Sequence, residues 1–460
     1  MGHGLRIFAP TIRTAMRSIL VLGAGRSATS LIHYLIAHAR EHQWRLIVGD
    51  RDLAHAQGLV AGASEVARAI ALDATDNEAR MHAIDRSDVV ISMLPAFMHM
   101  AVVKDCIHAR KHVITPSYVP DELWALEGAV RDAGIVSLNE LGLDPGIDHM
   151  SAMRILDRIR AEGGTMQAFE SHTGGLVAPG SDTDPWGYKF SWNPRNVVLA
   201  GQGGAARYVQ DGATRYIPYH KLFSRTVQVT VPGYGEYEGY ANRDSLKYRK
   251  FYGLDGIPTL LRGTVRKAGF CAAWDALVRL GCTDDSYPME LPEDATWLHY
   301  LEAFLPPGSG SSPQQVLADY LGLDVGGEVV AKLAWLGLFG DGPIGHSGLS
   351  PAATLQTLLE RKWMLAPHDK DLVVMWHRFV YSLDGVEHEI NASLAVEGDD
   401  QRNTAMAKTV GLPLGIATKL VLNGDVTQRG VLLPLEPTIY DPVLDELETL
   451  GIRFVEEQVA

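Results

Sequence analysis

The first 140 residues alternate between short apolar runs and stretches whose apolar positions follow a helical period. The run 18–22 predicts a strand, and a glycine turn follows it at once. Apolar residues then recur on one face of a predicted helix, at Ala28, Leu31, Ile32, Leu35 and Ile36. Further strands are predicted at residues 46–50, 69–73, 88–95, 112–115 and 135–138. This alternation predicts a parallel α/β sheet that binds ligands at the carboxyl ends of its strands.

The turn after the first strand has the glycine spacing of a dinucleotide-binding loop. Gly23, Gly25 and Ala28 fill the G-x-G-x-x-A pattern, in which glycine lets the backbone approach a pyrophosphate closely. Arg26 and Ser27 lie between them, where the free amides and the dipole of the helix start favour phosphate. We predict that these five residues bind the pyrophosphate of a dinucleotide.

The second predicted strand ends in an acid, and this acid bears on the choice of cofactor. Asp50 lies 22 residues after Ala28, where a carboxylate accepts hydrogen bonds from the adenosine ribose. Such a carboxylate repels a 2′-phosphate, so we expect NAD, with NADP as the less favoured cofactor. Arg51 follows directly and could instead pair with that phosphate.

Other predicted strands also end in residues suited to a ligand. We expect cofactor contacts at Asp73, Ala74 and Met93, which lie at the carboxyl ends of the third and fourth predicted strands. Ser117 and Tyr118 follow the fifth strand, where the nicotinamide and the substrate should meet. A tyrosine hydroxyl there could bind substrate or relay a proton, or the ring could simply close the top of the sheet.

The periodicity changes after residue 142. Segment 226–231 reads as a strand, 306–312 is a turn-rich break, and 313–362 is helical in pattern. Strands are again predicted at 371–375, and 379–381 and 389–394 look like antiparallel partners. Residues 404–422 predict a helix.

Composition and charge exclude several classes of protein. The chain has 460 residues, 46% of them hydrophobic, and a formal net charge of −14, which is unfavourable for binding nucleic acid or an anionic membrane. No run approaches the roughly 18 apolar residues of a membrane span. The three cysteines have no metal-ligand spacing, so we expect no metal site and a reducing, cytoplasmic location. The sequence leaves a homodimer open.

The first fifteen residues carry Arg6 and Arg13 and no acid. They are too short for a secretory signal. A leader, a transit peptide, and a natural start at Met16 all stay open.

Two strings of the chain are specific motifs: Gly-Leu-Asp-Pro-Gly at 142–146 and Lys-Phe-Ser-Trp at 189–192. Further motifs, in chain order, lie at 92–95, 117–119, 173–176, 242–245, 261–264 and 404–413. With these motifs the chain resembles the saccharopine dehydrogenase (saccharopine reductase) family, the enzymes that act at the glutamate side of saccharopine.

The resemblance implies a chain of three structural parts, and the sequence pattern agrees. We expect a Rossmann-type domain, a mixed α/β substrate domain and a small helical domain. The predicted boundaries are 16–142 for the first, 143–305 with 371–403 for the second, 306–370 for the third, and 404–460 for a C-terminal helix and tail that pack back on the first two.

The resemblance also implies the reaction. A nicotinamide accepts a hydride from a secondary amine, and water then splits the resulting imine. Saccharopine would yield glutamate and aminoadipate semialdehyde, or be formed in the reverse direction, in lysine metabolism. The amine must lose its proton first, so a proton acceptor is needed nearby.

Substrate and catalytic residues follow from the same resemblance. Arg243 and Arg266 are expected to clamp substrate carboxylates in a pocket between the first two domains, because guanidinium groups bind carboxylates with paired hydrogen bonds. Tyr118 and Asp144 are the catalytic candidates; Asp144 could hold the substrate ammonium, act as base, or merely cap a helix. The remaining expected contacts are Ser117, Asn193, Thr264 and Val265 with substrate, and Leu143, Asp144 and Pro145 with the cofactor.

Three further candidates are ambiguous. Asp148 and His149 could form an acid–base pair, but capping and packing of the helix near Ile147 is the favoured interpretation. Lys189 suits a carboxylate ligand and a surface position equally well.

Departures from the family pattern cluster at the expected substrate site. His172 and Thr173 replace a Tyr-Cys pair, Asn193 replaces a serine, and Val-Ala-Pro-Gly at 177–180 replaces Pro-Ala-Pro-Glu. Two alternatives therefore stay open: a related opine or carboxypolyamine dehydrogenase, and a catalytically silent NAD-binding sensor. A polyamine substrate would call for acids where arginines stand.

Overall fold

The computed structural model describes residues 16–307 and 311–459. They form two compact units. Within the described residues, unit 1 comprises 16–141 and 414–433, and unit 2 comprises 142–307, 311–413 and 434–459. The open questions about a leader concern residues 1–15, which lie outside the described residues.

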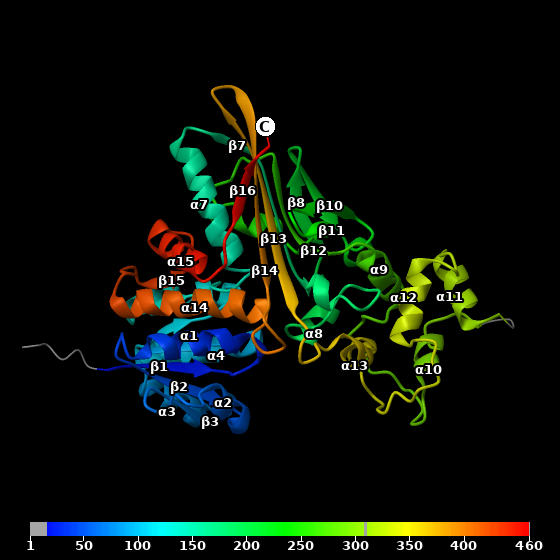
Figure 1. Cartoon of the computed structure of the whole chain (residues 1–460), viewed down its shortest axis with the longest axis horizontal. Coiled ribbons are helices and arrows are strands. Elements are labelled where there is room, and N and C mark those ends of the chain that lie inside the picture. Colours follow the sequence, from blue (N-terminus) through cyan, green and yellow to red (C-terminus); the bar gives the residue numbers. More distant parts are fainter. Residues whose placement is uncertain (1–15, 308–310, 460) are drawn as a thin grey trace, which may run out of the picture. The chain divides into compact units, whose positions relative to one another are not determined.

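Unit 1 is built on a parallel sheet of the doubly wound type. Its strand order is β15-β6-β5-β4-β1-β2-β3, so six of its strands have the 3-2-1-4-5-6 order of a Rossmann fold (Figure 1). The strands are β1 (Arg17–Leu22), β2 (Trp44–Asp50), β3 (Ala67–Ala71), β4 (Val89–Ser92), β5 (His112–Ile114), β6 (Val136–Leu138) and β15 (Gly430–Leu432). Strand β3 begins and ends two residues earlier than its predicted range of 69–73.

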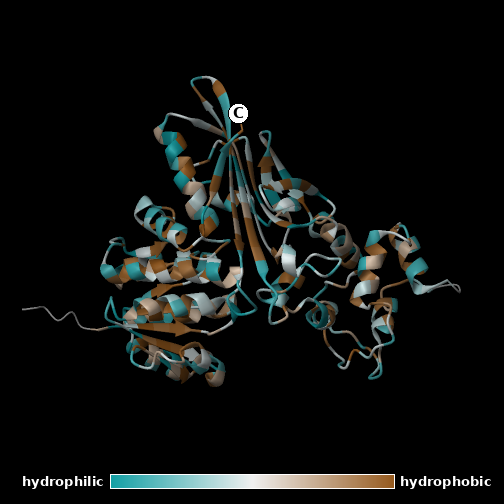
Figure 2. Ribbon diagram, viewed as in Figure 1, coloured by the Kyte–Doolittle hydropathy of each residue, from teal (hydrophilic) through white to brown (hydrophobic). Residues whose placement is uncertain are grey.

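Helices separate these strands and bury them. The helices are α1 (Thr29–Ala39), α2 (Leu53–Leu59), α3 (Asn77–Asp85), α4 (His99–Ala109), α5 (Asp121–Trp124) and α6 (Glu127–Asp132). Strands covered on both faces need continuous apolar runs, and Ile19, Leu20, Val21 and Leu22 are all fully buried. Figure 2 shows the same contrast as hydrophobic strands beside helices of mixed character.

The seventh strand was not predicted. Strand β15 comes from the far end of the chain and pairs in parallel with β6. It has three residues, too few for a periodic signal. The carboxylate of Glu127 anchors it by accepting a hydrogen bond from the Val431 amide at 2.5 Å.

Helix α14 (Ala405–Asn423) confirms the helix predicted at 404–422. Among the described residues it alone has the length and hydropathy that a membrane span needs, yet 78% of its apolar window is buried inside the protein. Gly415 explains part of this burial, because a Cβ there would lie 2.4 Å from the Tyr34 ring on α1. These features are typical of a core helix.

Unit 2 contains a mixed sheet with the order β10-β11-β12-β7-β13-β14-β16, to which β8 and β9 are joined at β12. Its strands are β7 (Thr165–Val177), β8 (Ala206–Gln210), β9 (Ala213–Ile217), β10 (Thr226–Val231), β11 (Gly235–Ala241), β12 (Thr259–Lys267), β13 (Asp371–Leu383), β14 (Val386–Glu397) and β16 (Val455–Gln458). Strands β13 and β14 pair antiparallel, as predicted.

The helices of unit 2 cover the sheet and form a helical segment of their own. They are α7 (Ile147–Ala161), α8 (Pro194–Val198), α9 (Phe270–Leu280), α10 (Trp297–Glu302), α11 (Pro313–Leu321), α12 (Glu328–Leu336), α13 (Pro351–Trp363) and α15 (Pro437–Thr449). A buried cluster containing Trp186, Trp274, Tyr300 and Trp363 joins α9 to the segment α10–α13. The predicted fold class, a Rossmann-type part with a mixed α/β part and a helical part, is confirmed.

Asp371 links the sheet of unit 2 to the start of α14. Its carboxylate is buried and accepts hydrogen bonds from the amides of Ala405, at 2.6 Å, and Met406, at 3.0 Å. Asp371→Ala would leave two buried donors without a partner, so we expect the free energy of unfolding to fall by about 2–4 kcal/mol. Denaturant titration measures this loss.

Asp400 is the matched control, because it accepts the amides of Arg402 and Asn403 in a more exposed loop. Asp400→Ala should cost less than about 1 kcal/mol, since water can replace its contacts. Equal losses in the two variants would contradict the assigned role of Asp371.

Candidate functional site

The turn after β1 leaves room for a ligand. Gly23 has φ +95°, and a Cβ there would lie 3.0 Å from the carbonyl oxygen of Met93, so only glycine fits without strain. A Cβ on Gly25 would meet no atom within 4 Å. This open backbone leads into the helical turn Arg26–Ala28 and then α1, so the loop fits a dinucleotide pyrophosphate.

Asp50 is engaged by the backbone around that turn. Its carboxylate accepts a hydrogen bond from the Ala24 amide at 2.7 Å and another from the Asp52 amide at 2.9 Å. Each carboxylate oxygen therefore accepts a hydrogen bond from a backbone amide, and these bonds offset part of the carboxylate charge. Asp50 organises the loop, and its negative charge alone does not decide which cofactor binds.

Two exposed arginines belong to the predicted cofactor site: Arg26 in the turn after β1, and Arg51 directly after Asp50 in the sequence. Asp73, after β3, accepts hydrogen bonds from the amide and hydroxyl of Thr75, and these bonds, with a smaller contribution from Arg51, lower the pKa of its carboxyl group. Ala74 is buried, whereas Met93 is half-buried at the end of β4.

Buried polar groups hold the Ser117–Tyr118 loop from two sides. His99 bonds to Ser92 Oγ through Nδ1 at 2.8 Å and to Ser117 Oγ through Nε2 at 2.7 Å. Burial lowers the pKa of His99 to about 4, so the ring is neutral near pH 7. Glu140 accepts a hydrogen bond from the Val119 amide at 2.9 Å. The loop is thereby fixed, with Tyr118 half-buried between its two anchors.

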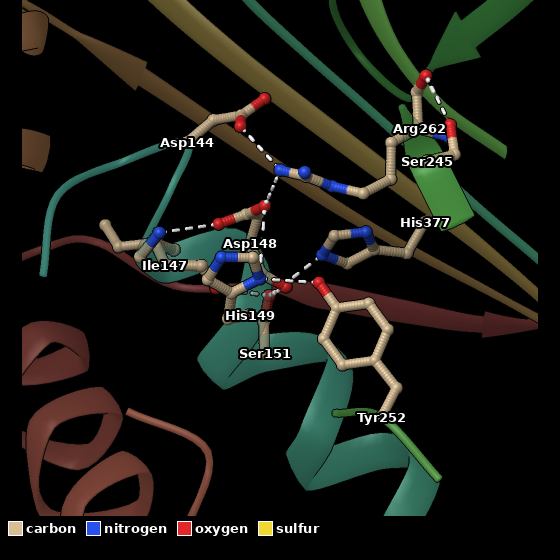
Figure 3. A network of polar contacts seen from close by, with 10 residues as sticks. Asp144, Ile147, Asp148, His149, Ser151, Ser245, Tyr252, Arg262 and His377 are labelled. Atoms are coloured by element: carbon tan, nitrogen blue, oxygen red, sulfur yellow. Dashed lines mark hydrogen bonds and ion pairs between the residues drawn. The ribbon is translucent and has the colours of Figure 1, made fainter. Parts of the chain in front are cut away.

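In unit 2, one guanidinium nitrogen bridges two carboxylates (Figure 3). Arg262 Nη2 donates to Asp144 Oδ1 at 2.7 Å and to Asp148 Oδ2 at 2.6 Å. The Arg262 guanidinium also lies 4.6 Å from the ring centre of Tyr248, and its backbone amide donates to Ser245 Oγ. This arrangement fixes Asp144 in the turn that precedes α7.

Asp148 is the buried centre of the same network. It accepts a further hydrogen bond from the Gly146 amide at 2.6 Å. Burial favours its neutral form, but the neighbouring His149, Arg262 and the Gly146 amide outweigh burial, and the pKa of Asp148 lies below its usual value. Its side chain contacts the start of α7, as the favoured interpretation of the sequence expected, and it is ion-paired as well.

Histidines and hydroxyls complete the network. His149 Nδ1 lies 2.5 Å from the Tyr252 hydroxyl and 3.6 Å from Asp148 Oδ2. His377 Nε2 lies 2.8 Å from Ser151 Oγ, and burial lowers the pKa of His377 to about 3. All these groups lie on or against one face of the sheet, because Arg262, Ser171 and His377 are aligned across β12, β7 and β13.

Arg266 lies on that face too, four residues further along β12, and it has a different environment. It is 4% exposed, and its guanidinium lies against the rings of Tyr188, Tyr240 and Phe270 at 5.2–5.9 Å from their centres. Nη1 donates to the Val265 carbonyl, while Nε has no hydrogen-bond partner. Within the described ranges no carboxylate forms an ion pair with Arg266, so it is a buried cation suited to an anionic ligand.

The other predicted substrate residues are dispersed. Arg243 is exposed and has φ 43°. The amide of the preceding residue, Asn242, donates to the carbonyl of Arg262. Arg243 therefore lies beside the Arg262 position of β12, away from Arg266. Asn193 is exposed and caps α8 by accepting the Arg195 amide. Their contacts with substrate stay predictions.

The five remaining candidates differ in burial and in their contacts within the protein. Lys189 is buried in an ion pair with Asp369 at 2.6 Å. Thr264 is half-buried beside the buried Val265. Leu143 and Pro145 are buried in the turn before α7.

The His172–Thr173 pair on β7 carries buried polar atoms that have no hydrogen-bond partner. Both ring nitrogens of His172 and the hydroxyl of Thr173 are buried without hydrogen bonds. The ring of His172 fills space that Gly239 and Gly263 leave, since a Cβ on Gly263 would lie 2.2 Å from it. Thr173 is on the face of Arg262, because it pairs with Thr264.

The sequence interpretation missed Arg262 and His99 as functional candidates. One signal could have identified Arg262: it and Arg266 interrupt a strand that is otherwise mostly uncharged, at a spacing that puts both on one face. His99 carries no such local signal. As for metals, residues 16–307 and 311–459 contain no group of three or more histidine, cysteine and acidic side chains that could hold an ion.

Comparison with known proteins extends the resemblance to the whole chain. The saccharopine dehydrogenase NADP binding domain matches residues 19–138, and the saccharopine dehydrogenase C-terminal domain matches 142–452. Saccharopine dehydrogenase [NADP(+), L-glutamate-forming] of Pyricularia oryzae is 35% identical over 97% of this chain and 100% of its own length. The protein of the same description from Saccharomyces cerevisiae is 35% identical over 96% of this chain and 100% of its own.

A solved structure agrees. The apo saccharopine dehydrogenase (L-Glu forming) from Saccharomyces cerevisiae superimposes with a TM-score of 0.87 and 34% identity, covering 96% of this chain and 100% of that one.

These comparisons correct one expectation. The preference for NAD, with NADP less favoured, is wrong, because the matching domain is described as NADP-binding and both relatives are named NADP(+)-dependent. The physical reason lies in the loop after β2, where protein amides engage Asp50 and Arg51 stands exposed beside it. With both of its domains matched and full-length relatives above 30% identity, the chain belongs to the saccharopine dehydrogenase family.

Proposed function

We propose that the protein is an NADP-dependent saccharopine dehydrogenase that releases glutamate and aminoadipate semialdehyde, or runs in the reverse direction, in lysine metabolism. The names of its full-length relatives support this proposal. The observation that carries it is Arg266, a buried cation without a carboxylate partner in the described part of the chain. A substrate rich in carboxylates would supply that missing charge.

The cofactor would be held by unit 1. The turn from Gly23 to Ala28 offers open backbone and a helix start to the pyrophosphate. Arg51 would pair with the 2′-phosphate, because Asp50 is engaged by the amides of Ala24 and Asp52. When bound, the nicotinamide supplies the acceptor for the hydride.

The substrate would be held by charges of unit 2. Arg266 would bind a carboxylate, and Asp144, fixed by Arg262, would face the amine nitrogen. The amine must be uncharged before its carbon can release a hydride, so a group near the nitrogen has to accept a proton. Asp144 and Tyr118 are proposed for this, with Tyr118 as the relay because its hydroxyl both donates and accepts.

An assay with alternative substrates tests the proposal directly. Purified protein is incubated with NADP and saccharopine, an opine, or a carboxypolyamine, while the absorbance of reduced nicotinamide is recorded. We expect turnover with saccharopine. Turnover with only the opine or the carboxypolyamine would assign the enzyme a different substrate. No turnover with any of the three compounds would favour a catalytically silent nucleotide-binding protein. A cytoplasmic location stays part of the proposal.

Replacing Arg51 tests the cofactor assignment. Arg51→Ala should raise KM for NADP by at least about tenfold, because a lost charged contact to phosphate costs more than about 1.4 kcal/mol. Turnover with NAD should not fall. Steady-state kinetics with both cofactors measure this, and Arg45→Ala, at an exposed position on β2, is the control. An equal effect on both cofactors would contradict the role of Arg51.

Replacing Arg266 tests the substrate site. Arg266→Met keeps a long side chain among the three rings but removes the charge, so kcat/KM for saccharopine should fall by a factor that corresponds to about 2–5 kcal/mol. The Kd for NADP, measured by fluorescence titration, should not change. Arg215→Met, at an exposed position on β9, removes the same charge as a control. Near-normal turnover by Arg266→Met would contradict the substrate assignment.

A further inference from the structure

The buried hydroxyls around His99 determine which nitrogen of its ring carries the proton. His99 is 7% exposed, and its ring lies between Ser92 at the end of β4 and Ser117 in the loop after β5. Burial lowers the pKa of His99 to about 4, so the neutral ring has one N–H donor and one nitrogen that accepts. Each serine hydroxyl is therefore either a donor to the ring or an acceptor from it.

Ser92 is the serine that has no alternative to donating. It is 1% exposed, and within residues 16–307 and 311–459 its hydroxyl contacts only His99 Nδ1, at 2.8 Å. If Nδ1 carried the proton, the hydroxyl of Ser92 would have to accept, and its own hydrogen would be buried without an acceptor. Such a buried, unpaired donor is costly, so Nδ1 is the acceptor and the proton lies on Nε2.

Thr115 favours the same assignment. Its hydroxyl is buried, lies 3.4 Å from His99 Nδ1 and 3.5 Å from Nε2, and accepts the amide of Ser117 at 3.3 Å. The ring is the acceptor within reach of its hydrogen in the described part of the chain. Two buried hydroxyls, those of Ser92 and Thr115, thus require an unprotonated nitrogen, and Nδ1 is the nitrogen that both can reach.

This assignment leaves the hydroxyl hydrogen of Ser117 for a ligand. His99 Nε2 donates to Ser117 Oγ at 2.7 Å, so the protein supplies that oxygen with a hydrogen. No group of the described ranges accepts the hydrogen of Ser117 in return. Ser117 is half-buried, so water or a ligand can accept there, whereas neither can reach Ser92. A protonated amine has no lone pair and cannot be that acceptor.

We propose that His99 is a positioning residue whose Nε2 proton makes the Ser117 hydroxyl a hydrogen-bond donor to a carboxylate of the substrate. The proposal rests on the proposed function, because saccharopine is rich in carboxylates and a carboxylate accepts hydrogen bonds without donating any. His99 acts only through Ser117.

The position of the proton can be measured without turnover. Protein labelled with 15N-histidine gives a two-dimensional 1H–15N spectrum in which protonated and unprotonated ring nitrogens have different shifts. The histidine whose signals change most in Ser117→Ala identifies His99. We expect its proton on Nε2 near neutral pH. A proton on Nδ1, or on both nitrogens, would overturn the inference.

Two replacements of His99 separate its two nitrogens. The amide of glutamine reaches the place of Nε2 and can donate to Ser117, whereas the shorter asparagine reaches only the place of Nδ1 and can accept from Ser92. We expect KM for saccharopine to rise about tenfold in His99→Asn and to stay within about threefold of wild type in His99→Gln. The value of kcat should change little in either, because a carboxylate contact is present in the ground state and in the transition state.

A merely structural role of His99 predicts a different result. Both replacements remove the ring, so both variants would then lose stability and activity alike. Equal KM values for saccharopine in His99→Asn and His99→Gln would therefore contradict the inference.

The double variant His99→Asn with Ser117→Ala shows whether His99 acts through Ser117. Ser117→Ala removes the donor itself and should raise KM for saccharopine by at least about tenfold. Adding His99→Asn should raise KM by less than about twofold further, because the hydroxyl that His99 orients is already gone. Independent, multiplied effects of the two replacements would show that His99 does not act through Ser117.

His346 provides the matched control. Its Nε2 lies 3.1 Å from the hydroxyl of Thr357, and it is half-buried in the loop before α13. His346→Asn removes a contact of the same type from unit 2 and should leave KM and kcat for saccharopine within about twofold of wild type.

Failure of the inference can be told apart from failure of the proposed function. A rise of KM for NADP but not for saccharopine in Ser117→Ala would overturn the inference, because the hydroxyl would then serve the cofactor. If His99→Asn does not fold, Ser117→Ala and the position of the proton decide alone. Absence of turnover by the wild-type protein would overturn the proposed function, and with it the substrate carboxylate, while the spectrum would still report the proton of His99.

Discussion

The site depends on how strand β12 distributes buried charge. Arg262 and Arg266 lie four residues apart on one face of this strand, about 13 Å along it. Arg262 has two carboxylates, and Arg266 has rings, one carbonyl and no ion-paired acid in the described part of the chain. The guanidinium of Arg262 is therefore ion-paired within the protein, whereas that of Arg266 is buried without an acidic partner among the described residues.

The difference between the two arginines fits a ligand that carries a carboxylate. Burial makes an uncompensated guanidinium costly, and the rings of Tyr188, Tyr240 and Phe270 offset that cost only in part. A ligand carboxylate would supply the remaining counter-charge, and it would bind a guanidinium that folding has already removed from water. An amine bound at Asp144 would meet a carboxylate whose orientation is already set.

The sequence predicted the parts that depend on local pattern. Strand, glycine turn and helix in unit 1 follow from short apolar runs and helical periodicity, and the loop at Gly23 and Gly25 was found in this way. Strand β15 escaped prediction, because three residues carry no period and pairing with β6 comes only with the tertiary fold.

The site was predictable only in outline. Arg266 and Asp144 came from family motifs, but the bond that fixes Asp144 joins residues 118 positions apart, and no local pattern predicts it. Asp50 shows a different limit: its position predicted a ribose contact, whereas its hydrogen bonds to Ala24 and Asp52 depend on loop geometry. The cofactor expectation failed for this reason.

A crystal structure of the protein with saccharopine bound tests the charge arrangement most directly. The account predicts a substrate carboxylate on the guanidinium of Arg266, with Nε among its donors, and the secondary amine nitrogen within hydrogen-bonding distance of Asp144. A substrate carboxylate bound at Arg262 in place of Asp144, with no anion at Arg266, would contradict it.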